Sequence, residues 1–475
     1  MMNVNQKRSG PTRTSLRLQY VWISAIVPAL IALGGSIYFV ILETRSWART
    51  QTILEQCKLQ KEPVDDSSLE NWYSLRTFSE GFELWNEICR LSSDPQSPSP
   101  YLLSPSIPSD DYPTSLNPDR DWKDKERIRS YLGHYQPILD MLDRAEEYPK
   151  PVRFQIAFDG FATPLPFVQK AQAIQQLVRL DFEYASYCRN TTRALMDLRR
   201  MRTVEQSLDA PLCVVWKLVQ LQLLDNRLSA LGRSLSYSAW SDEELRVLED
   251  ESRVTVLTSD AWKSIFLGER AMYLSEIHRK SSSWLTTDPT ETGVSSPLLP
   301  SGEQLILDYF QKLLDLGTLN PDEITEYSLD SLNPSSFTKS SLSLSRLSLD
   351  RIHAGVSAIY GSADALTKVI HQCKELRNLV RTAIALRRYN HLHSHWPRDL
   401  HELESLGLKI QDYSTPSGRV FGYQVEEGVA CLWGTDRRRG IIDDQCPPGE
   451  GIPETDPRDP MFIRLFPGTQ EAVTN

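Results

Sequence analysis

The sequence predicts a mainly α-helical protein with one N-terminal transmembrane helix, a helical-hairpin body and a small C-terminal α+β element. A charge-free apolar run near the N-terminus predicts the membrane helix. Apolar residues at three- and four-residue steps predict the body, and a change to short alternating segments near the C-terminus predicts strands. At 475 residues the chain is too long for one core of typical size, so several structural units are expected.

The segment from Leu18 to Leu42 contains no charged side chain. About 20 apolar residues suffice for a helix to cross a hydrocarbon core roughly 30 Å thick, so this segment is predicted to span the membrane. Four basic residues precede it and place the N-terminus in the cytoplasm and the body on the exported, periplasmic side. They are Lys7, Arg8, Arg13 and Arg17.

A cleaved signal peptide is the alternative for the same segment. Basic residues precede an apolar stretch, and small residues around Ala32 to Ser36 provide a candidate cleavage site. The apolar run continues to Ile41, beyond such a site, which favours an uncleaved anchor. Under either interpretation the body is exported.

Charge and cysteine content exclude some classes of function. The formal net charge is -10, whereas a nucleic-acid-binding surface needs concentrated Lys and Arg, so no nucleic-acid partner is expected. The 7 cysteines include no CxxC pair, which disfavours a zinc ribbon or a thioredoxin-type site. Cys431 and Cys446 could close a disulfide loop or remain separate thiols.

Two stretches rich in Ser divide the exported part, and the first is also rich in Pro. The resulting units are a cytoplasmic basic tail (1–17), the transmembrane helix (18–42), a short helical segment (43–91), a Ser/Pro-rich linker (92–121), a helical body (122–326), a Ser-rich linker (327–348), a long helix (349–390), a β-element (391–446) and a tail (447–475).

The body shows helical periodicity without a fixed repeat, which favours antiparallel helical hairpins. One predicted helix face contains Phe167, Ala171, Ile174, Leu177, Val178, Phe182 and Ala185. A second helix is predicted to open at Asp209, with Pro211 in its first turn. This helix would contain Val215, Val219, Leu223 and Leu228.

The clearest helix start lies at Ser241. Ser241 and Glu244 have the spacing of a capping box, and Trp240 and Leu245 have the spacing of a hydrophobic staple. Glu269 and Arg270 are interpreted as a helix-surface or interhelical ion pair. Further helices are predicted over roughly Ala261–His278 and Asp350–Tyr389.

The pattern changes after Tyr389. Trp396-Pro397 interrupts the helix, and Gly407 ends one short helical turn that contains Leu400, Leu403 and Leu406. Two short strands joined by a turn are predicted next. They contain Val420, Phe421 and Tyr423 in the first strand, and Val429, Cys431 and Trp433 in the second.

The stretch from about Arg387 to Asp444 resembles the globular end of the major pseudopilins of type II secretion. That pattern is a long helix ending in an aromatic residue, an aromatic-Pro step, spaced leucines, a Pro-x-Ser/Thr-Gly turn and an aromatic-rich hairpin. The matching residues are Tyr389, Trp396-Pro397, Leu400, Leu403, Thr415-Pro416-Ser417-Gly418, Phe421, Tyr423 and Leu432-Trp433-Gly434.

The middle of the chain resembles single-pass bacterial membrane proteins of unknown function that have a helix-rich exported body and end in the same element. Phe158-Asp159-Gly160-Phe161 and Gly268-Glu269-Arg270-Ala271 carry this looser likeness. True pseudopilins have a prepilin-peptidase site before the apolar helix, whereas here Gly10 is followed by Pro11, Thr12 and Arg13. The helix is therefore expected to be a permanent tether.

Asp436, Asp443 and Asp444 are candidate calcium ligands, because this loop resembles the region where major pseudopilins bind calcium. Calcium needs several oxygen ligands, and carboxylates could supply some of them. The intervening basic run, Arg437 to Arg439, would oppose a cation, so an ordinary charged loop is the alternative.

His391, His393 and His395, with His401 nearby, are candidate metal ligands, because imidazole binds zinc, copper and nickel. Alternating histidines in a turn point in different directions, so the alternative is a solvated polar turn before Trp396.

No catalytic signature is present. The Ser336-x-x-Lys339 spacing matches some acyl-transfer enzymes, but it lies in a Ser-rich stretch without companion motifs, so it is interpreted as a chance match. The sequence favours a membrane-anchored, non-enzymatic scaffold or interaction module of the bacterial envelope, without a cofactor, that binds other envelope proteins. The alternative is an exported hydrolase or ligand-binding enzyme.

Overall fold

The computed structural model describes residues 13–92, 125–237, 240–283, 300–317, 332, 346–434 and 462–466. Within these ranges, the structure gives the backbone alone for residues 13–32, 237, 280–283, 300–302, 346–355 and 462.

The described chain is mainly helical, as the sequence predicts. Its α-helices are α1 (Arg13–Leu59), α2 (Asp66–Ser74), α3 (Phe82–Leu91), α5 (Lys125–Ala145), α6 (Pro166–Tyr187), α7 (Thr191–Ser207), α8 (Val214–Tyr237), α9 (Asp242–Ser252), α10 (Ser259–Ser283), α11 (Pro300–Leu316) and α14 (Arg346–His393). Two 3₁₀-helices follow, η1 (Leu400–Leu406) and η2 (Ile410–Tyr413), and then the strands β1 (Gly422–Glu426), β2 (Val429–Trp433) and β3 (Phe462–Leu465).

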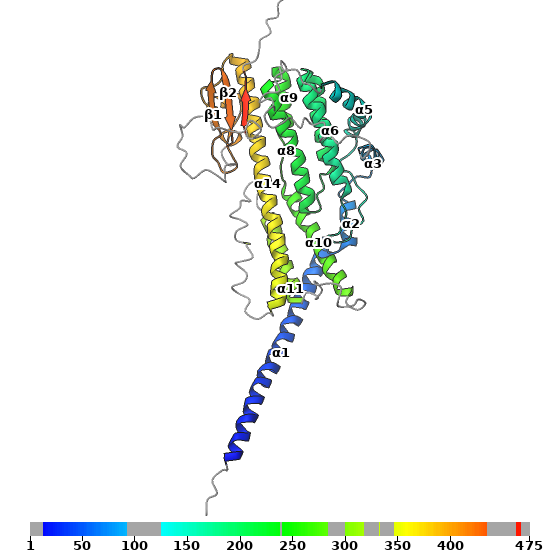
Figure 1. Ribbon diagram of the computed structural model, residues 1–475, viewed down its shortest axis with the longest axis vertical. Coiled ribbons are helices and arrows are strands. Elements are labelled where there is room, and N and C mark those ends of the chain that lie inside the picture. The colour runs from blue at the N-terminus through cyan, green and yellow to red at the C-terminus, as the bar shows by residue number, and fades with distance from the viewer. Residues whose placement is uncertain are drawn as a thin grey trace, which may run out of the picture.

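The helices form an elongated bundle in which α6, α8 and α14 follow the long axis (Figure 1). The helix α1 projects from one end of the bundle, and the strands lie beside α14 at the opposite end (Figure 1). The helix α14 packs along α8, and α6 packs against both α7 and α8. A buried stripe on α14 contains Ala363, Leu366, Ile370, Cys373, Leu376, Val380 and Ile384.

Local signals in the sequence identify two helices correctly. All seven residues of the predicted face on α6 are buried. At the start of α9, Ser241 Oγ accepts from the main-chain nitrogen of Glu244 at 3.3 Å, and Glu244 Oε2 accepts from the main-chain nitrogen of Ser241 at 2.8 Å. The capping box is therefore confirmed, and Trp240 and Leu245 are both buried beside it.

The structure places Val215, Val219, Leu223 and Leu228 in α8, as predicted, but the predicted start of this helix is wrong. The helix begins at Val214 instead of Asp209, and Val215 is 61% exposed whereas Leu223 and Leu228 are fully buried. The start depends on another helix, because Glu269 Oε1 of α10 accepts from the main-chain nitrogen of Val214 at 2.8 Å. Since α8 contacts α6, α7, α10 and α14, it is buried on several sides and has no simple apolar stripe.

The C-terminal strands form an antiparallel sheet of order β1-β2-β3. Glu427 and Gly428, both with positive φ (50° and 81°), make the predicted turn between β1 and β2. In β3, Ile463 and Leu465 are buried and Arg464 is exposed. The sequence did not predict β3, because four residues are too few to show alternation clearly and they lie in the expected tail, 447–475.

One hydrophobic cluster includes residues of the body, α14 and the sheet. Charged residues also lie inside the body. Arg200 is 5% exposed and donates to both carboxylate oxygens of Asp143 at 2.7 and 2.6 Å, and to Asp197 Oδ1 at 2.7 Å. Arg193 pairs with Asp181. Burial, and next the charge of Asp181, raise the pKa of Asp197, although Arg200 opposes that shift.

Replacing this carboxyl group, in Asp197→Asn, should stabilise the protein at pH 8. The unfolded carboxyl titrates near its ordinary value of about 3.9 and the folded one at a higher pH, so the wild type loses stability as the pH rises between these values. The variant should not lose stability in this way. At pH 8 its free energy of unfolding should exceed that of the wild type by on the order of 1 kcal/mol, because it has no second buried carboxyl group that must ionise beside Asp181. Urea unfolding of the full chain in detergent at pH 5 and pH 8 measures both effects.

The same substitution at Asp143 is the matched control. Asp143→Asn should destabilise the protein by about 1–3 kcal/mol, because it removes the two-point contact with a buried arginine. A lower stability of Asp197→Asn at pH 8 would contradict the assignment of Asp197 as the buried group that is costly to ionise.

Candidate functional site

The helix α1 has an exposed apolar part and a packed part. In the exposed part, six apolar side chains are each at least 40% exposed. They are Leu33 and the five consecutive residues Ile37, Tyr38, Phe39, Val40 and Ile41. Further along, Ser46, Thr50, Leu54 and Cys57 are buried at steps of four, four and three residues, which places them on one face against α11. The apolar part therefore extends beyond the body (Figure 1).

A membrane span is not identified in the structure. Among the residues that it describes, no helix is long and apolar enough to cross a membrane. The predicted span, Leu18–Leu42, lies inside the continuous helix α1, but its side chains before Leu33 are outside the described set. The span stays a prediction.

A hollow of about 830 Å³ lies where α1 meets α10 and α11. Arg49 of α1 pairs with Asp308 of α11 at 3.3 Å on its wall. Just after α1, Glu62 pairs with Lys263 at 3.1 Å and with Arg270 at 3.0 Å, and both partners belong to α10. Burial raises the pKa of Glu62, but the hydrogen bonds and charges of Arg270 and Lys263 outweigh burial and lower it.

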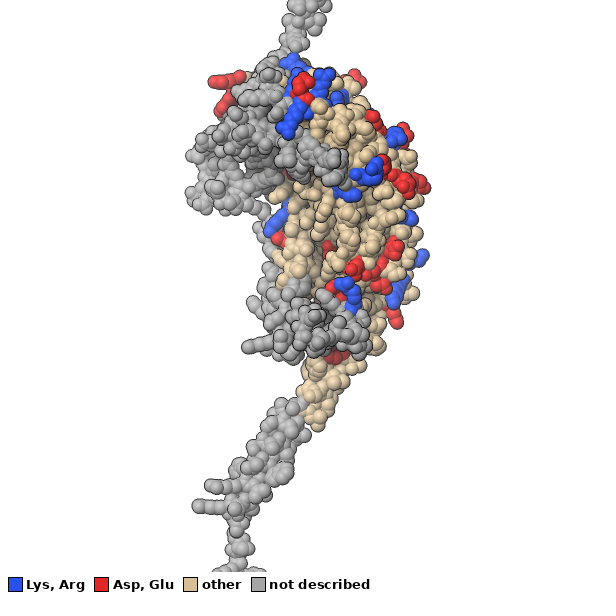
Figure 2. Space-filling view, turned by 45° about the vertical axis from the view of Figure 1, so that its right-hand side comes forward, with Lys and Arg blue, Asp and Glu red and all other residues tan. Residues whose placement is uncertain are grey.

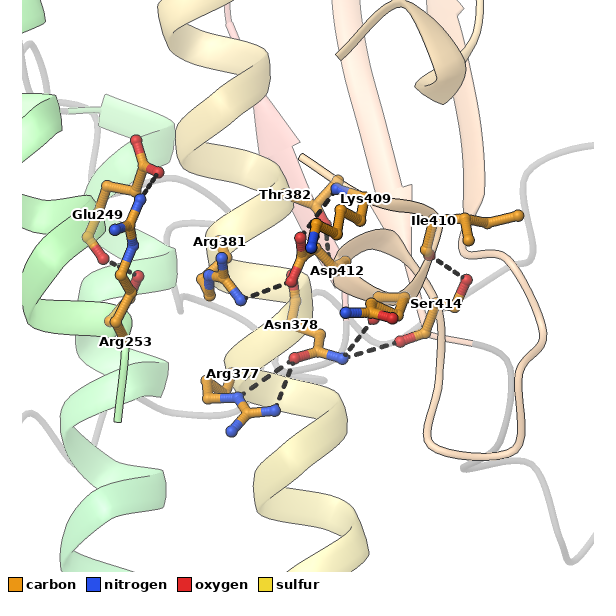
Figure 3. Close-up of polar contacts among 12 residues, drawn as sticks. Glu249, Arg253, Arg377, Asn378, Arg381, Thr382, Lys409, Ile410, Asp412 and Ser414 are labelled. Carbon is orange, nitrogen blue, oxygen red and sulfur yellow. Dashed lines mark hydrogen bonds and ion pairs between the residues drawn. The ribbon is translucent and has the colours of Figure 1, made fainter. Parts of the chain in front are cut away.

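At the other end of the body, Asn378 connects α14 to η2 (Figure 3). Asn378 is buried, and its Nδ2 donates to the main-chain oxygens of Gln411 and Ser414, both at 3.1 Å. Its Oδ1 accepts from Nε and Nη2 of Arg377 at 3.2 and 3.1 Å. Both functional groups of the amide are therefore used.

An ion pair one turn further along α14 completes this contact. Arg381 Nη1 donates to Asp412 Oδ1 at 2.8 Å, and the main-chain oxygen of Asp412 accepts from Thr382 Oγ1 at 3.2 Å (Figure 3). The second carboxylate oxygen of Asp412 accepts from the main-chain nitrogen of Lys409 at 2.9 Å. We call residues 396–434 and 462–466 the C-terminal module, and these contacts hold it on α14.

His391 and His393 lie in the last turn of α14, which ends at His393, whereas His395 lies in the bend that follows the helix. His393 and His395 both lie beside the Tyr389 ring, at centroid distances of 4.3 and 5.8 Å. Burial and then Arg387 lower the pKa of His391, although Asp242 opposes them. Across the described part of the chain, no three His, Cys, Asp or Glu side chains are grouped to hold a metal ion. Metal binding at these histidines stays a prediction.

Several candidates lie outside the described residues. They are the calcium candidates Asp436, Asp443 and Asp444, the cysteine Cys446, and the Ser336–Lys339 pair. Cys431 is a buried thiol in β2, and burial raises its pKa. Calcium binding and the disulfide stay predictions.

The outer surface shows no large field of one sign on the face in Figure 2, where acidic and basic side chains are interspersed among uncharged ones. The C-terminal module carries four exposed apolar side chains, Ile410 (54%), Val420 (40%), Val425 (40%) and Phe466 (37%). Such side chains are candidate contacts for a protein partner.

Sequence reasoning missed one polar site inside the body. Lys217 and Gln220 on α8 are buried and line a hollow of about 250 Å³. No short motif marks these residues. Of the two residues interpreted as a helix-surface or interhelical ion pair, Arg270 pairs with Glu62, and Glu269 accepts from the main-chain nitrogen of Val214. Lys217 is the single charged residue between Val214 and Leu224, but this pattern alone does not show that the lysine is buried.

Comparison of the chain with protein-family models, with curated proteins and with solved structures finds no match in any of the three. The pseudopilin resemblance therefore stays a prediction.

Replacing the amide that holds the module, in Asn378→Ala, should loosen the module without unfolding the bundle. The variant leaves two main-chain oxygens without their donor, which costs about 1–3 kcal/mol. Hydrogen exchange measured by mass spectrometry should become faster in residues 408–416 and remain unchanged in α6.

Asn71→Ala, at an exposed position on α2, is the control and should leave exchange unchanged in both segments. Equal protection of residues 408–416 in Asn378→Ala and the wild type would show that Asn378 does not hold the module.

Proposed function

We propose that this protein is a single-pass envelope protein in which α1 is a permanent membrane tether and the exported body presents the C-terminal module to another envelope protein. The observation that carries the proposal is the division of α1 into an exposed apolar part, 33–41, and a packed part, 46–57. One helix thereby connects a surface that requires an apolar environment to the folded body.

The exposed part of α1 is apolar on all sides, since residues 37–41 are consecutive and cover more than one helical turn. A helix of this kind is typical of a membrane span or of a buried core. Each large apolar side chain gains about 1.5–3 kcal/mol when it is removed from water. Together with the charge-free sequence that precedes it, this part supports the tether.

The position of the C-terminal module supports the presentation role. It lies at the end of the body opposite to α1 (Figure 1). Its contacts through Asn378 and Asp412 hold it on a 48-residue helix. The C-terminal module, with exposed Val420 and Val425 and held far from the tether, is a suitable surface for a partner that lies away from the bilayer.

Arginines in the proposed span should impair membrane retention. In the variant with Leu33→Arg and Ile37→Arg, each arginine costs up to roughly 2.5–3.5 kcal/mol in a span. The wild type should stay in the membrane pellet after alkaline carbonate extraction, and part of the variant should appear in the supernatant. Trp47→Arg is the matched control, because Trp47 is an exposed apolar residue of α1 outside the span, and it should be retained. Release of the wild type would contradict the tether.

A photo-reactive amino acid in the C-terminal module should capture an envelope protein in native membranes. We expect cross-links from positions 420 and 425, and none from position 196, where Met196 is equally exposed (40%) on α7. Mass spectrometry of the cross-linked bands identifies the partner. If positions 420, 425 and 196 give the same pattern, or none of them gives a product, the presentation role is wrong.

A further inference from the structure

The hollow of about 250 Å³ lies between the end of α7, the first half of α8 and the segment that follows α9. Its deeper wall contains Lys217, Gln220 and Arg227 of α8 and Glu205 of α7, all buried. Leu221, Leu224 and Val256 add an apolar part to the lining. Asp209 is exposed and lies at the mouth.

Lys217 is the buried cation of this hollow that has no anionic partner. It is 5% exposed, and its Nζ donates to Gln220 Oε1 at 2.8 Å. No carboxylate among the described residues lies within ion-pair distance of this ammonium. An ammonium has three hydrogens to donate, so two of them face the hollow or its walls without a protein acceptor.

The other deep charges are paired. Arg227 Nε and Nη2 donate to the two carboxylate oxygens of Glu205 at 2.8 and 3.0 Å. At the exposed edge of the lining, Arg202 Nη1 donates to Glu251 at 3.1 Å. Burial lowers the pKa of Lys217, although the charges of Asp209, Cys373 and Glu205 oppose that shift. Since a buried charge without a counter-charge is costly, this site is incomplete in the protein alone.

A carboxylate marks the mouth of the same hollow. Asp209 Oδ1 accepts from Gln220 Nε2 at 3.0 Å, and none of the cations that the structure describes forms an ion pair with it. The amide of Gln220 therefore joins Lys217 at the floor to Asp209 at the mouth. The hollow offers one unpaired positive group inside and one unpaired negative group outside.

We propose that this hollow binds a free α-amino acid with a small aliphatic side chain, whose carboxylate faces Lys217 and whose ammonium faces Asp209. A zwitterion supplies both missing counter-charges, whereas a simple anion would leave Asp209 unpaired and a simple cation would leave Lys217 unpaired. The volume lies below the roughly 300–1,000 Å³ of pockets for drug-sized ligands, so the ligand is small. Leu221, Leu224 and Val256 suit a short aliphatic side chain.

This site is independent of the proposed tether and presentation role. It lies on α7 and α8 within the body, and it uses none of the residues that hold the C-terminal module. Ligand binding here can therefore fail without affecting the tether, and the reverse is also true.

The test uses the full chain in detergent and three probes that differ by one charged group. L-Alanine has both groups, propionate lacks the ammonium, and ethylamine lacks the carboxylate. Isothermal titration should show saturable binding of L-alanine, at least tenfold weaker binding of propionate, and no binding of ethylamine. Lys217→Met should weaken L-alanine binding at least tenfold and keep the thermal midpoint of the ligand-free protein, because it removes a buried unpaired charge.

Lys368→Met is the matched control, because Lys368 is an exposed lysine of α14 that pairs with Asp364 at 2.7 Å, and it should bind L-alanine like the wild type. Asp209→Asn, at the exposed mouth, should lose the preference for L-alanine over propionate, and it tests the proposal even if Lys217→Met does not fold.

Three results would overturn the proposal. They are no binding of L-alanine at millimolar concentration, equal binding of L-alanine by folded Lys217→Met and the wild type, or an undiminished preference for L-alanine in Asp209→Asn. Equal binding of propionate and L-alanine by the wild type would identify a simple anion site instead.

Discussion

The side chain of Arg387 is the contact on which the arrangement of the upper body depends. It is 6% exposed on α14, and its Nε donates to the main-chain oxygen of Leu235 at 2.8 Å. Its Nη2 donates to the oxygen of Ser236, and its Nη1 to that of Phe466. The last carbonyls of a helix have no partner inside it, so a cation near them satisfies hydrogen bonds and interacts favourably with the helix dipole. Arg387 thus joins the end of α8, the residue after β3 and α14.

Burial lowers the pKa of Arg387 to about 10, and no carboxylate among the described residues pairs with it. Its guanidinium lies 5.8 Å from the centroid of the Trp396 ring, so an aromatic face and carbonyls together take the place of a counter-ion. Close packing supports the same junction. A Cβ on Gly232 of α8 would meet Ile463 and Val380 at 3.3 Å, so α8 approaches the sheet and α14 closely at this glycine. The C-terminal module is therefore an extension of the helical core.

The parts of this fold that the sequence predicts are those determined by local chemistry. The α6 face follows from periodicity, and the start of α9 follows from Ser241 and Glu244 alone. The start of α8 could not be predicted, because it depends on Glu269 and on the absence of a side chain at Gly268, where a Cβ would lie 1.9 Å from the oxygen of Leu212. The burial of Lys217 could not be predicted for the same reason, because the residues that cover it come from several helices that are distant in the sequence.

The functional candidates divide in the same way. The apolar run before the body can be recognised from composition, because a membrane span is a property of one helix. The hollow at Lys217 cannot be recognised from composition, because the charged residues that line it come from α7, α8 and the segments around them. The histidine candidates, in contrast, rested on spacing, and His391 and His393, in the last turn of α14, leave the helix axis in different directions.

The junction between α1 and the body limits how the proposed tether could act. Arg49 pairs with Asp308, and Glu62 pairs with Lys263 and Arg270, so charged contacts hold both the packed part of α1 and the residues just after it. Arg270 is 2% exposed, and removal of Glu62 would leave it buried without a counter-charge, which typically costs 3–5 kcal/mol. A free hinge at this point would have to break these pairs. The orientation of α1 in a bilayer would therefore set the orientation of α10 and α11, and through the shared core it would also set the direction in which the C-terminal module faces.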